Sequence, residues 1–115
     1  MPNVIMNDPL RVAVVGLGKL GLFHSEILNQ LPEAELTAIV DADSGSRSRA
    51  RSIGLNPPTY DSIKLMMDKE KVDAVFVCTP TFAHFPLVEK IASYGLHIFV
   101  EKPFTEKYAK SIELL

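Results

Sequence analysis

A glycine-rich hexapeptide is the segment of this 115-residue sequence whose spacing points most directly to chemistry. Gly16, Gly18 and Gly21 fit the pattern G-x-G-x-x-G without a mismatch. In such a loop the first glycine permits a tight turn, the second lets the main chain approach a pyrophosphate, and the third lets a helix pack against a sheet. The N–H groups of the helix's first turn then attract the phosphates. The predicted pyrophosphate site consists of Gly16, Leu17, Gly18, Lys19, Leu20 and Gly21; the alternative is a glycine-rich turn that binds nothing.

An acidic residue, Asp41, lies twenty residues beyond Gly21, at the expected end of a second strand. A carboxylate there can accept both hydroxyls of an adenosine ribose and would repel a 2′-phosphate, which favours NAD over NADP. Arg47 and Arg49 leave NADP open, because a guanidinium can pair with a 2′-phosphate. The alternative is that both arginines are exposed helix charges. Asp41 could also cap the following helix, although Asp43 is the better candidate for that role.

A second group of candidates follows the apolar run at 74–77. In open α/β sheets, ligands bind outside the carboxyl ends of the strands, so the main chain after this run should pass along a bound dinucleotide. The candidates are Cys78, Thr79, Pro80 and His84. Cys78 is expected to be a buried small apolar residue rather than a nucleophile. His84 is placed early in the next helix, where it either faces the ligand or lies on the helix surface.

The tripeptide Glu101-Lys102-Pro103 comes at the end of the fifth expected strand, again at the carboxyl edge. A lysine there can donate hydrogen bonds or, with its pKa lowered by burial and a bound cationic nicotinamide, exchange a proton. Pro103 restricts the main chain around Lys102 and could hold the side chain in one direction. A surface lysine before a proline is the alternative.

Short apolar runs alternate with longer amphipathic segments, a rhythm typical of β-α-β units. The expected strands are 11–15, 35–40, 58–60, 74–77 and 97–100, and the expected helices are 18–31, 44–53, 62–69, 83–94 and a last one that Thr105 would cap. This order predicts an α/β fold with a doubly wound parallel sheet, the Rossmann fold.

Apolar spacing also predicts which helix residues face the core. In the first helix these are Leu20, Phe23, Ile27, Leu28 and Leu31, with Pro32 ending the helix. Asp61 is expected to cap the helix at 62–69, and Ile53 and Ala92 are expected core contacts.

Composition narrows the class of protein. The chain is 47% hydrophobic and 23% charged with a net charge of −2, as expected of one globular domain, here residues 11–115 preceded by an extension at 1–10. A single cysteine excludes an internal disulfide and a thiolate zinc cluster. Twelve basic against fourteen acidic residues argue against nucleic acid, and the apolar runs are too short to cross a membrane. We therefore expect a cytoplasmic protein.

With these motifs in place, the chain resembles the N-terminal dinucleotide-binding domain of the glucose–fructose oxidoreductase, inositol dehydrogenase and rhizopine-catabolism (Gfo/Idh/MocA) family. The resemblance rests on Val-Gly-Leu-Gly-Lys-Leu-Gly-Leu-Phe-His at 15–24, Val-Asp-Ala-Asp at 40–43, Val-Asp-Ala-Val-Phe-Val-Cys-Thr-Pro-Thr at 72–81 and Gly-Leu-His-Ile-Phe-Val-Glu-Lys-Pro at 95–103. It implies a nicotinamide-dependent oxidoreductase acting on sugars, polyols and related hydroxyl compounds. The resemblance also implies that Lys102 matches the family's catalytic-site lysine and that Glu101 lies by the nicotinamide. Family members also carry a C-terminal domain that supplies most of the substrate pocket; without it, the expected function of this chain is cofactor binding.

Two other functions fit the same residues. The chain could be a non-catalytic NAD(H)-binding or protein-interaction module, or part of a reductase acting on other carbonyl or imine groups, since a fold and a cofactor motif do not fix the substrate. The sequence stops inside the last expected helix, before a sixth strand. We therefore expect an unfinished sheet edge and either association of copies through it or modest stability of the isolated chain.

Overall fold

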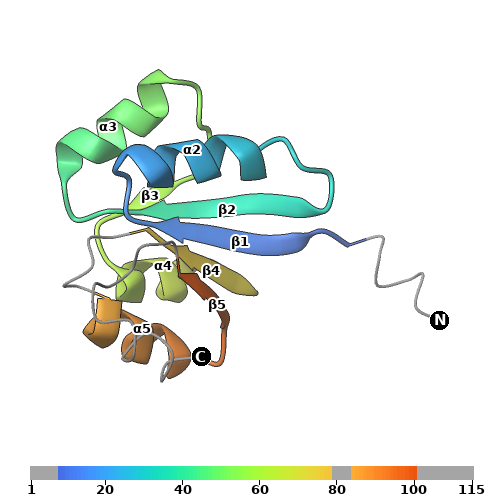
Figure 1. Cartoon of the computed structure of the whole chain (residues 1–115), viewed down its shortest axis with the longest axis vertical. Helices are drawn as coiled ribbons and strands as arrows, with labels where there is room; N and C mark the ends of the chain where they lie inside the picture. Colours follow the sequence, from blue (N-terminus) through green and yellow to red (C-terminus); the bar gives the residue numbers. More distant parts are fainter. Residues whose placement is uncertain (1–7, 79–83, 101–115) are drawn as a thin grey trace.

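The computed structural model describes residues 8–78 and 84–100, the side chains of residues 84 and 85 excepted, and contains one parallel sheet with the strand order β3-β2-β1-β4-β5 (Figure 1). The elements in chain order are β1 (Leu10–Val15), α2 (Lys19–Leu28), β2 (Ala34–Val40), α3 (Ser44–Ser52), β3 (Thr59–Tyr60), α4 (Ile63–Lys69), β4 (Ala74–Val77), α5 (His84–Ala92) and β5 (His97–Val100). Every strand lies within one residue of its predicted bounds, and the doubly wound parallel sheet is confirmed.

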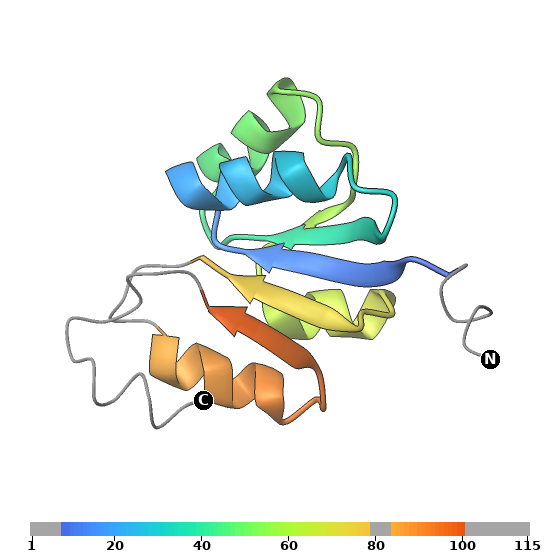
Figure 2. The same ribbon diagram turned by 45° about the vertical axis from the view of Figure 1, so that its right-hand side comes forward.

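The sheet separates two layers of helices. Helices α2 and α3 cover one face, and α4 and α5 cover the other (Figures 1 and 2). Alternate residues of β1 therefore enter different cores: Val12 and Val14 pack with Leu17 and Leu28, whereas Val15 packs with residues of α4 and α5. All strand arrows point to the same edge (Figure 2). The strand order reverses between β1 and β4, which is where open α/β sheets bind ligands.

Helix α2 turns a different face to the sheet from the predicted one. Its buried residues are Gly21, Ser25 and Leu28, which follow one another at helical spacing. Four of the five residues predicted to face the core are instead exposed: Leu20, Phe23, Ile27 and Leu31. Small residues occupy the inner face because they let the helix lie close to the end of β1. The Ser25 hydroxyl is buried with its hydrogen bond satisfied, since it donates to the Gly21 carbonyl at 2.7 Å.

Smaller differences concern helix ends and single side chains. Helix α2 ends at Leu28, before Pro32 could end it. Ser62 rather than Asp61 caps α4, its hydroxyl accepting the Leu65 N–H at 3.2 Å. Ile53 is exposed just after α3, and Leu55 fills the core in its place; Ala92 is also exposed, at the end of α5.

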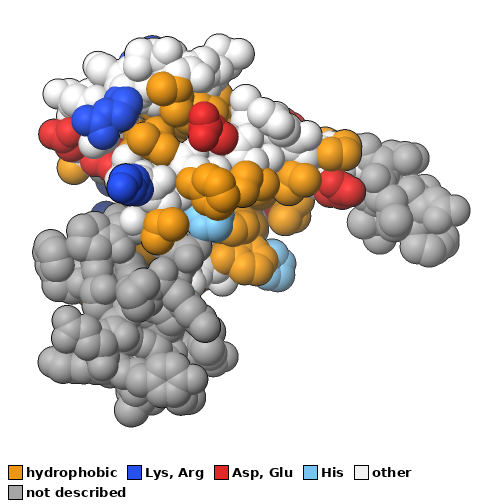
Figure 3. Space-filling model, turned by 45° about the horizontal axis from the view of Figure 1, so that its top comes forward, with side chains coloured by type: hydrophobic (Ala, Val, Ile, Leu, Met, Phe, Trp, Pro, Cys, Tyr) orange, Lys and Arg blue, Asp and Glu red, His pale blue; other side chains and the backbone are white. Residues whose placement is uncertain are grey.

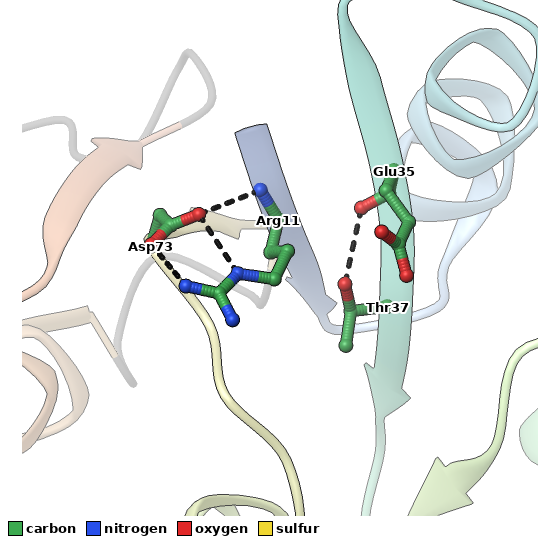
Figure 4. Close-up of polar contacts among 4 residues, drawn as sticks. All are labelled: Arg11, Glu35, Thr37 and Asp73. Atoms are coloured by element: carbon green, nitrogen blue, oxygen red, sulfur yellow. Dashed lines mark hydrogen bonds and ion pairs between the residues drawn. The ribbon is translucent and has the colours of Figure 1, made fainter. Parts of the chain in front are cut away.

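An ion pair ties the amino ends of β1 and β4 together (Figure 4). The Asp73 carboxylate accepts the Arg11 main-chain N–H at 2.8 Å, its Nε at 3.2 Å and its Nη2 at 3.1 Å. The Asp73 N–H in turn donates to the Arg11 carbonyl at 2.8 Å. The pair joins β1 to β4 at the edge opposite the carboxyl ends of the strands, so it leaves the ligand edge free.

Acid should weaken the fold through Asp73. Hydrogen bonds from the Arg11 side chain, and then from its main chain, hold the pKa of this carboxyl below its usual value. A lowered folded-state pKa stabilises the fold above the unfolded pKa, and this contribution is lost as pH falls below about 4. We expect the urea midpoint to fall less steeply with acid in Asp73→Asn than in the parent chain. Asp68→Asn, on the exposed surface of α4, is the matched control; equal slopes for all three proteins would contradict the assignment.

Candidate functional site

The glycine loop joins β1 to α2 at the carboxyl edge of the sheet. Gly16 has a φ of +97°, a conformation that side chains rarely adopt, so the predicted tight turn is confirmed. The Gly16 N–H donates to the Val40 carbonyl at 2.8 Å, and the Cys78 N–H donates to the Val15 carbonyl at 2.7 Å. The loop is therefore held between the ends of β2 and β4, at the point where the strand order reverses.

Gly18 is a glycine that the fold itself does not require. Its φ of −67° suits any residue, and a Cβ added there would meet no atom of residues 8–78 and 84–100 within 4 Å. Gly18 is the N-cap of α2, and no side chain caps the helix there. The first-turn N–H groups of a helix have no partners within the helix, so they remain available to an anion. The space beside Gly18 is therefore open for a ligand that approaches the main chain.

Gly21 is needed for the opposite reason. A Cβ at this position would come within 1.8 Å of the Gly16 carbonyl oxygen and 3.5 Å of the Cys78 Cβ. Gly16 and Cys78 directly follow β1 and β4, so the absence of a side chain at Gly21 lets α2 lie close to the ends of these strands. This confirms the predicted role of the third glycine, close packing of the helix on the sheet.

Asp41 ties the tip of β2 to the glycine loop. Its Oδ2 accepts the Leu17 N–H at 2.7 Å, and its Oδ1 accepts the Asp43 N–H at 2.8 Å. Each carboxylate oxygen has a second lone pair, so the group can still accept hydroxyl hydrogens. Asp43 caps α3 as predicted, accepting the Ser46 N–H at 2.8 Å, and this bond lowers the pKa of its carboxyl.

Two further residues hold Asp41 in place. The interpretation of Arg47 as an exposed helix charge is wrong: it is half-buried, and its Nη1 donates to the Asp41 carbonyl at 2.7 Å. Arg49 is exposed, as that interpretation expected. Sequence reasoning missed Tyr60, whose carbonyl accepts the Asp41 N–H at 3.0 Å. The Tyr60 hydroxyl donates to the Glu70 carboxylate, which raises its pKa to about 12. Only its place at the end of the edge strand could have signalled this role.

The structure brings together part of the predicted site. Leu17 is buried in the core and its N–H donates to Asp41, so neither its side chain nor its N–H is available to a ligand. Lys19 and Leu20 are exposed at the start of α2. Cys78 follows β4 and is half-buried, rather than fully buried as predicted. The side chain of His84, the first residue of α5, lies outside the described part of the structure. Thr79, Pro80, Glu101 and Lys102 also lie outside the described residues.

Other kinds of site receive no support from the described ranges. Within residues 8–78 and 84–100, no group of three His, Cys, Asp or Glu side chains could hold a metal ion. Over the same part of the chain, no helix is long and apolar enough to cross a membrane.

Comparison with known proteins identifies a family. The model of the Gfo/Idh/MocA oxidoreductase family, described as having an NAD-binding Rossmann fold, matches residues 10–115. The scyllo-inositol 2-dehydrogenase (NAD(+)) of Bacillus subtilis is 36% identical over 102 residues, covering 87% of this chain and 30% of that protein. The inositol 2-dehydrogenase of Rhizobium meliloti is 35% identical over 95 residues, which cover 82% of this chain and 28% of that dehydrogenase.

Solved structures agree on the fold. The myo-inositol 2-dehydrogenase of Lactobacillus plantarum superposes with a TM-score of 0.77 and 32% identity, over 93% of this chain and 32% of that one. The WlbA dehydrogenase of Bordetella pertussis, solved with NADH and UDP-GlcNAcA, superposes with a TM-score of 0.81 and 23% identity, over 93% of this chain and 32% of that one. At this identity the comparison shows a shared fold alone. This chain thus spans about a third of the length of the proteins it matches.

Proposed function

Because the chain belongs to the Gfo/Idh/MocA oxidoreductase family and is its NAD-binding Rossmann domain, we propose that its glycine loop and Asp41 hold the cofactor for hydride transfer to or from a hydroxyl-bearing carbon. The observation that carries this proposal is the open space beside Gly18. The fold does not require a glycine there, and the position adjoins an uncapped helix start and a carboxylate at the next strand. A dinucleotide needs both the helix start and the carboxylate, because its pyrophosphate binds at a helix N-terminus and its ribose hydroxyls bind an acidic side chain.

Each part of the site has a role toward the cofactor. The main-chain N–H groups of residues 18–21 bind the pyrophosphate, since those of Gly16 and Leu17 already donate within the protein. Asp41 accepts the hydroxyls of the adenosine ribose. Arg47 holds the main chain of Asp41 through its carbonyl and so orients the carboxylate. The same guanidinium lies at the strand tip where a 2′-phosphate would have to bind, so NADP is a second candidate cofactor. When bound, the nicotinamide supplies the group that accepts or donates the hydride.

Substrate chemistry belongs to the whole protein, of which this chain would be one domain. Relatives named as inositol dehydrogenases support a sugar or polyol as substrate. We assign Lys102 to donate a hydrogen bond to the reacting hydroxyl or to take its proton, with Glu101, Cys78, Thr79, Pro80 and His84 lining the cofactor. One cysteine and the use of a soluble cofactor favour the cytoplasm.

Fluorescence of the reduced cofactor tests the proposal directly. The chain contains no tryptophan, so titration with NADH or NADPH meets little protein emission. We expect saturable binding of NADH and weaker binding of NADPH. No binding of either would overturn the proposal. Tight binding without turnover of a polyol panel would favour the alternative, a non-catalytic NAD(H)-binding module; turnover by this chain would rule that alternative out.

Asp41→Ala should weaken NADH binding about 10- to 100-fold, because one charge-assisted contact to the ribose contributes about 1.5–3 kcal/mol. NADPH should lose less affinity, since the repulsion of its 2′-phosphate is removed at the same time. Asp43→Ala is the matched control: it removes a carboxylate two residues away that caps α3 and is expected to lower the melting temperature without changing affinity. Equal losses for the two variants would contradict the role of Asp41.

A further inference from the structure

The edge strand β3 is hydrogen-bonded to both helix layers through its two side chains. The Thr59 hydroxyl accepts a hydrogen bond from Arg51 Nη2 of α3 at 2.9 Å. The Tyr60 hydroxyl donates to the carboxylate of Glu70, the C-cap of α4, on the other side of the sheet (Figures 1 and 2). Successive side chains of a strand point to opposite faces, so even a strand of two residues can reach both layers. A strand this short has few main-chain hydrogen bonds, so these side-chain bonds help to fix its position.

The bond between Tyr60 and Glu70 joins two groups that are themselves held in place. The Glu70 N–H donates to the carbonyl of the fully buried Met66 at 2.8 Å, and Tyr60 packs against the core cluster that contains Met66. The hydrogen bond to Glu70, and then burial, raises the pKa of Tyr60 to about 12, so the hydroxyl remains a donor at neutral pH. A hydrogen bond to a carboxylate is roughly twice as strong as one between neutral groups. Tyr60 is therefore fixed to the end of α4.

The position of β3 matters at Asp41. The Asp41 carboxylate accepts the N–H groups of Leu17 and Asp43, and its carbonyl accepts Arg47 Nη1. The Asp41 N–H donates to the Tyr60 carbonyl at 3.0 Å, so this residue is hydrogen-bonded at its N–H, its carbonyl and both carboxylate oxygens. In Figure 3 the left of the molecule, where α3 begins, carries acidic and basic side chains. Hydrogen bonds rather than apolar packing therefore hold Asp41 at this end.

We propose that Tyr60 and Glu70 are positioning residues for cofactor binding: through the Tyr60 carbonyl they hold Asp41 where its carboxylate meets the hydroxyls of the adenosine ribose. This inference rests on the proposed function, since it takes the ribose to bind at Asp41. Groups that bind a ligand must be held within about 0.5 Å, by packing and by hydrogen bonds to residues that do not touch the ligand. A phenylalanine ring would fill the same space in the core, so the hydroxyl of Tyr60 serves position rather than packing.

NADH titration of Tyr60→Phe tests the proposal, because this variant keeps the ring and loses only the hydroxyl. We expect NADH affinity to fall about 5-fold, less than in Asp41→Ala, since the carboxylate remains but is held less firmly. In an Asp41→Ala background the same change should alter affinity by less than about 2-fold, because the group that Tyr60 positions is gone. A merely structural role would weaken binding equally in the two backgrounds.

Glu70 provides a second pair of variants. Glu70→Gln keeps an oxygen that can accept the Tyr60 hydroxyl and should bind NADH as the parent chain does, whereas Glu70→Ala should match Tyr60→Phe. Asp68→Ala is the matched control, because it removes a carboxylate two residues away, on the exposed surface of α4, that pairs with Lys64. If circular dichroism shows that Tyr60→Phe does not fold, the comparison of Glu70→Ala with Glu70→Gln remains the test.

Hydrogen exchange of the Asp41 amide, followed by NMR without cofactor, separates this proposal from the function. We expect exchange to be about 10-fold faster in Tyr60→Phe and Glu70→Ala, and unchanged in Glu70→Gln and Asp68→Ala. Unchanged NADH affinity in Tyr60→Phe, equal losses in the two backgrounds, equal weakening by Asp68→Ala or an unchanged exchange rate would each overturn the proposal. A parent chain that binds no NADH, although the exchange of Asp41 responds as expected, would overturn the proposed function and leave the coupling of Tyr60 to Asp41 standing.

Discussion

Gly21→Ala is expected to destabilise the chain strongly, lowering the melting temperature by about 15 °C or preventing folding. The added Cβ would come within 1.8 Å of the Gly16 carbonyl oxygen and 2.8 Å of the carbonyl carbon, and both atoms belong to the main chain. Gly16 cannot move aside easily, because its φ of +97° and its hydrogen bond to Val40 fix the turn. Overpacking against the main chain costs about 3 kcal/mol or more.

Thermal unfolding followed by far-ultraviolet circular dichroism measures this effect. Gly18→Ala supplies the matched control, because it adds the same methyl group within the same loop but into open space. We expect Gly18→Ala to melt within a few degrees of the parent chain. If Gly21→Ala melted as the parent does, α2 would not pack on Gly16 as closely as the structure has it.

The sequence predicted the strands and the glycine loop well because both depend on local rules. The strands are short apolar runs, of which β1, β2 and β4 are buried along most of their length, and a loop with glycines at fixed spacing allows few conformations. The inward face of α2 was predicted wrongly because apolar periodicity selects the largest side chains. Gly21 and Ser25 are buried for their small size, which periodicity cannot recognise. The large stripe with Phe23 and Ile27 instead faces a space that no described element fills.

The environment of Asp41 was predictable only in part. Its place at the end of β2 follows from the strand pattern, and so does its position near the loop. Its bond to the Leu17 N–H joins residues 24 apart in sequence, and Tyr60 reaches it from an edge strand of two residues. Pairings of this kind depend on how the strands are ordered in space, and no single-residue preference encodes them. The contact of Arg47 with the Asp41 carbonyl joins residues only six apart, and it depends instead on which side of α3 faces the end of β2.

Gly18→Ala should abolish useful cofactor binding while leaving the fold intact. An alanine is compatible with the φ of −67°, and its Cβ would meet no atom of the described part of the chain within 4 Å. The free energy of unfolding should therefore stay equal or rise by about 0.4–1 kcal/mol. The methyl group would occupy the space through which a pyrophosphate must approach the helix N-terminus. Loss of two N–H contacts to phosphate, at about 1.5 kcal/mol each, corresponds to a weakening of NADH binding of about 100-fold.

The measurement pairs an NADH fluorescence titration with a melting curve on the same Gly18→Ala sample. Gly45→Ala is the matched control for affinity, because it adds a methyl group on exposed α3, away from Gly18. Its Cβ would lie 3.2 Å from the carboxylate of Asp43, a side chain whose removal is itself expected to leave affinity unchanged. A stable Gly18→Ala chain that binds NADH as the parent does would mean that the space beside Gly18 is not where the phosphates bind, and the assignment of the glycine loop would have to be given up. An unstable Gly18→Ala chain would show instead that the glycine serves the fold, contrary to its open surroundings.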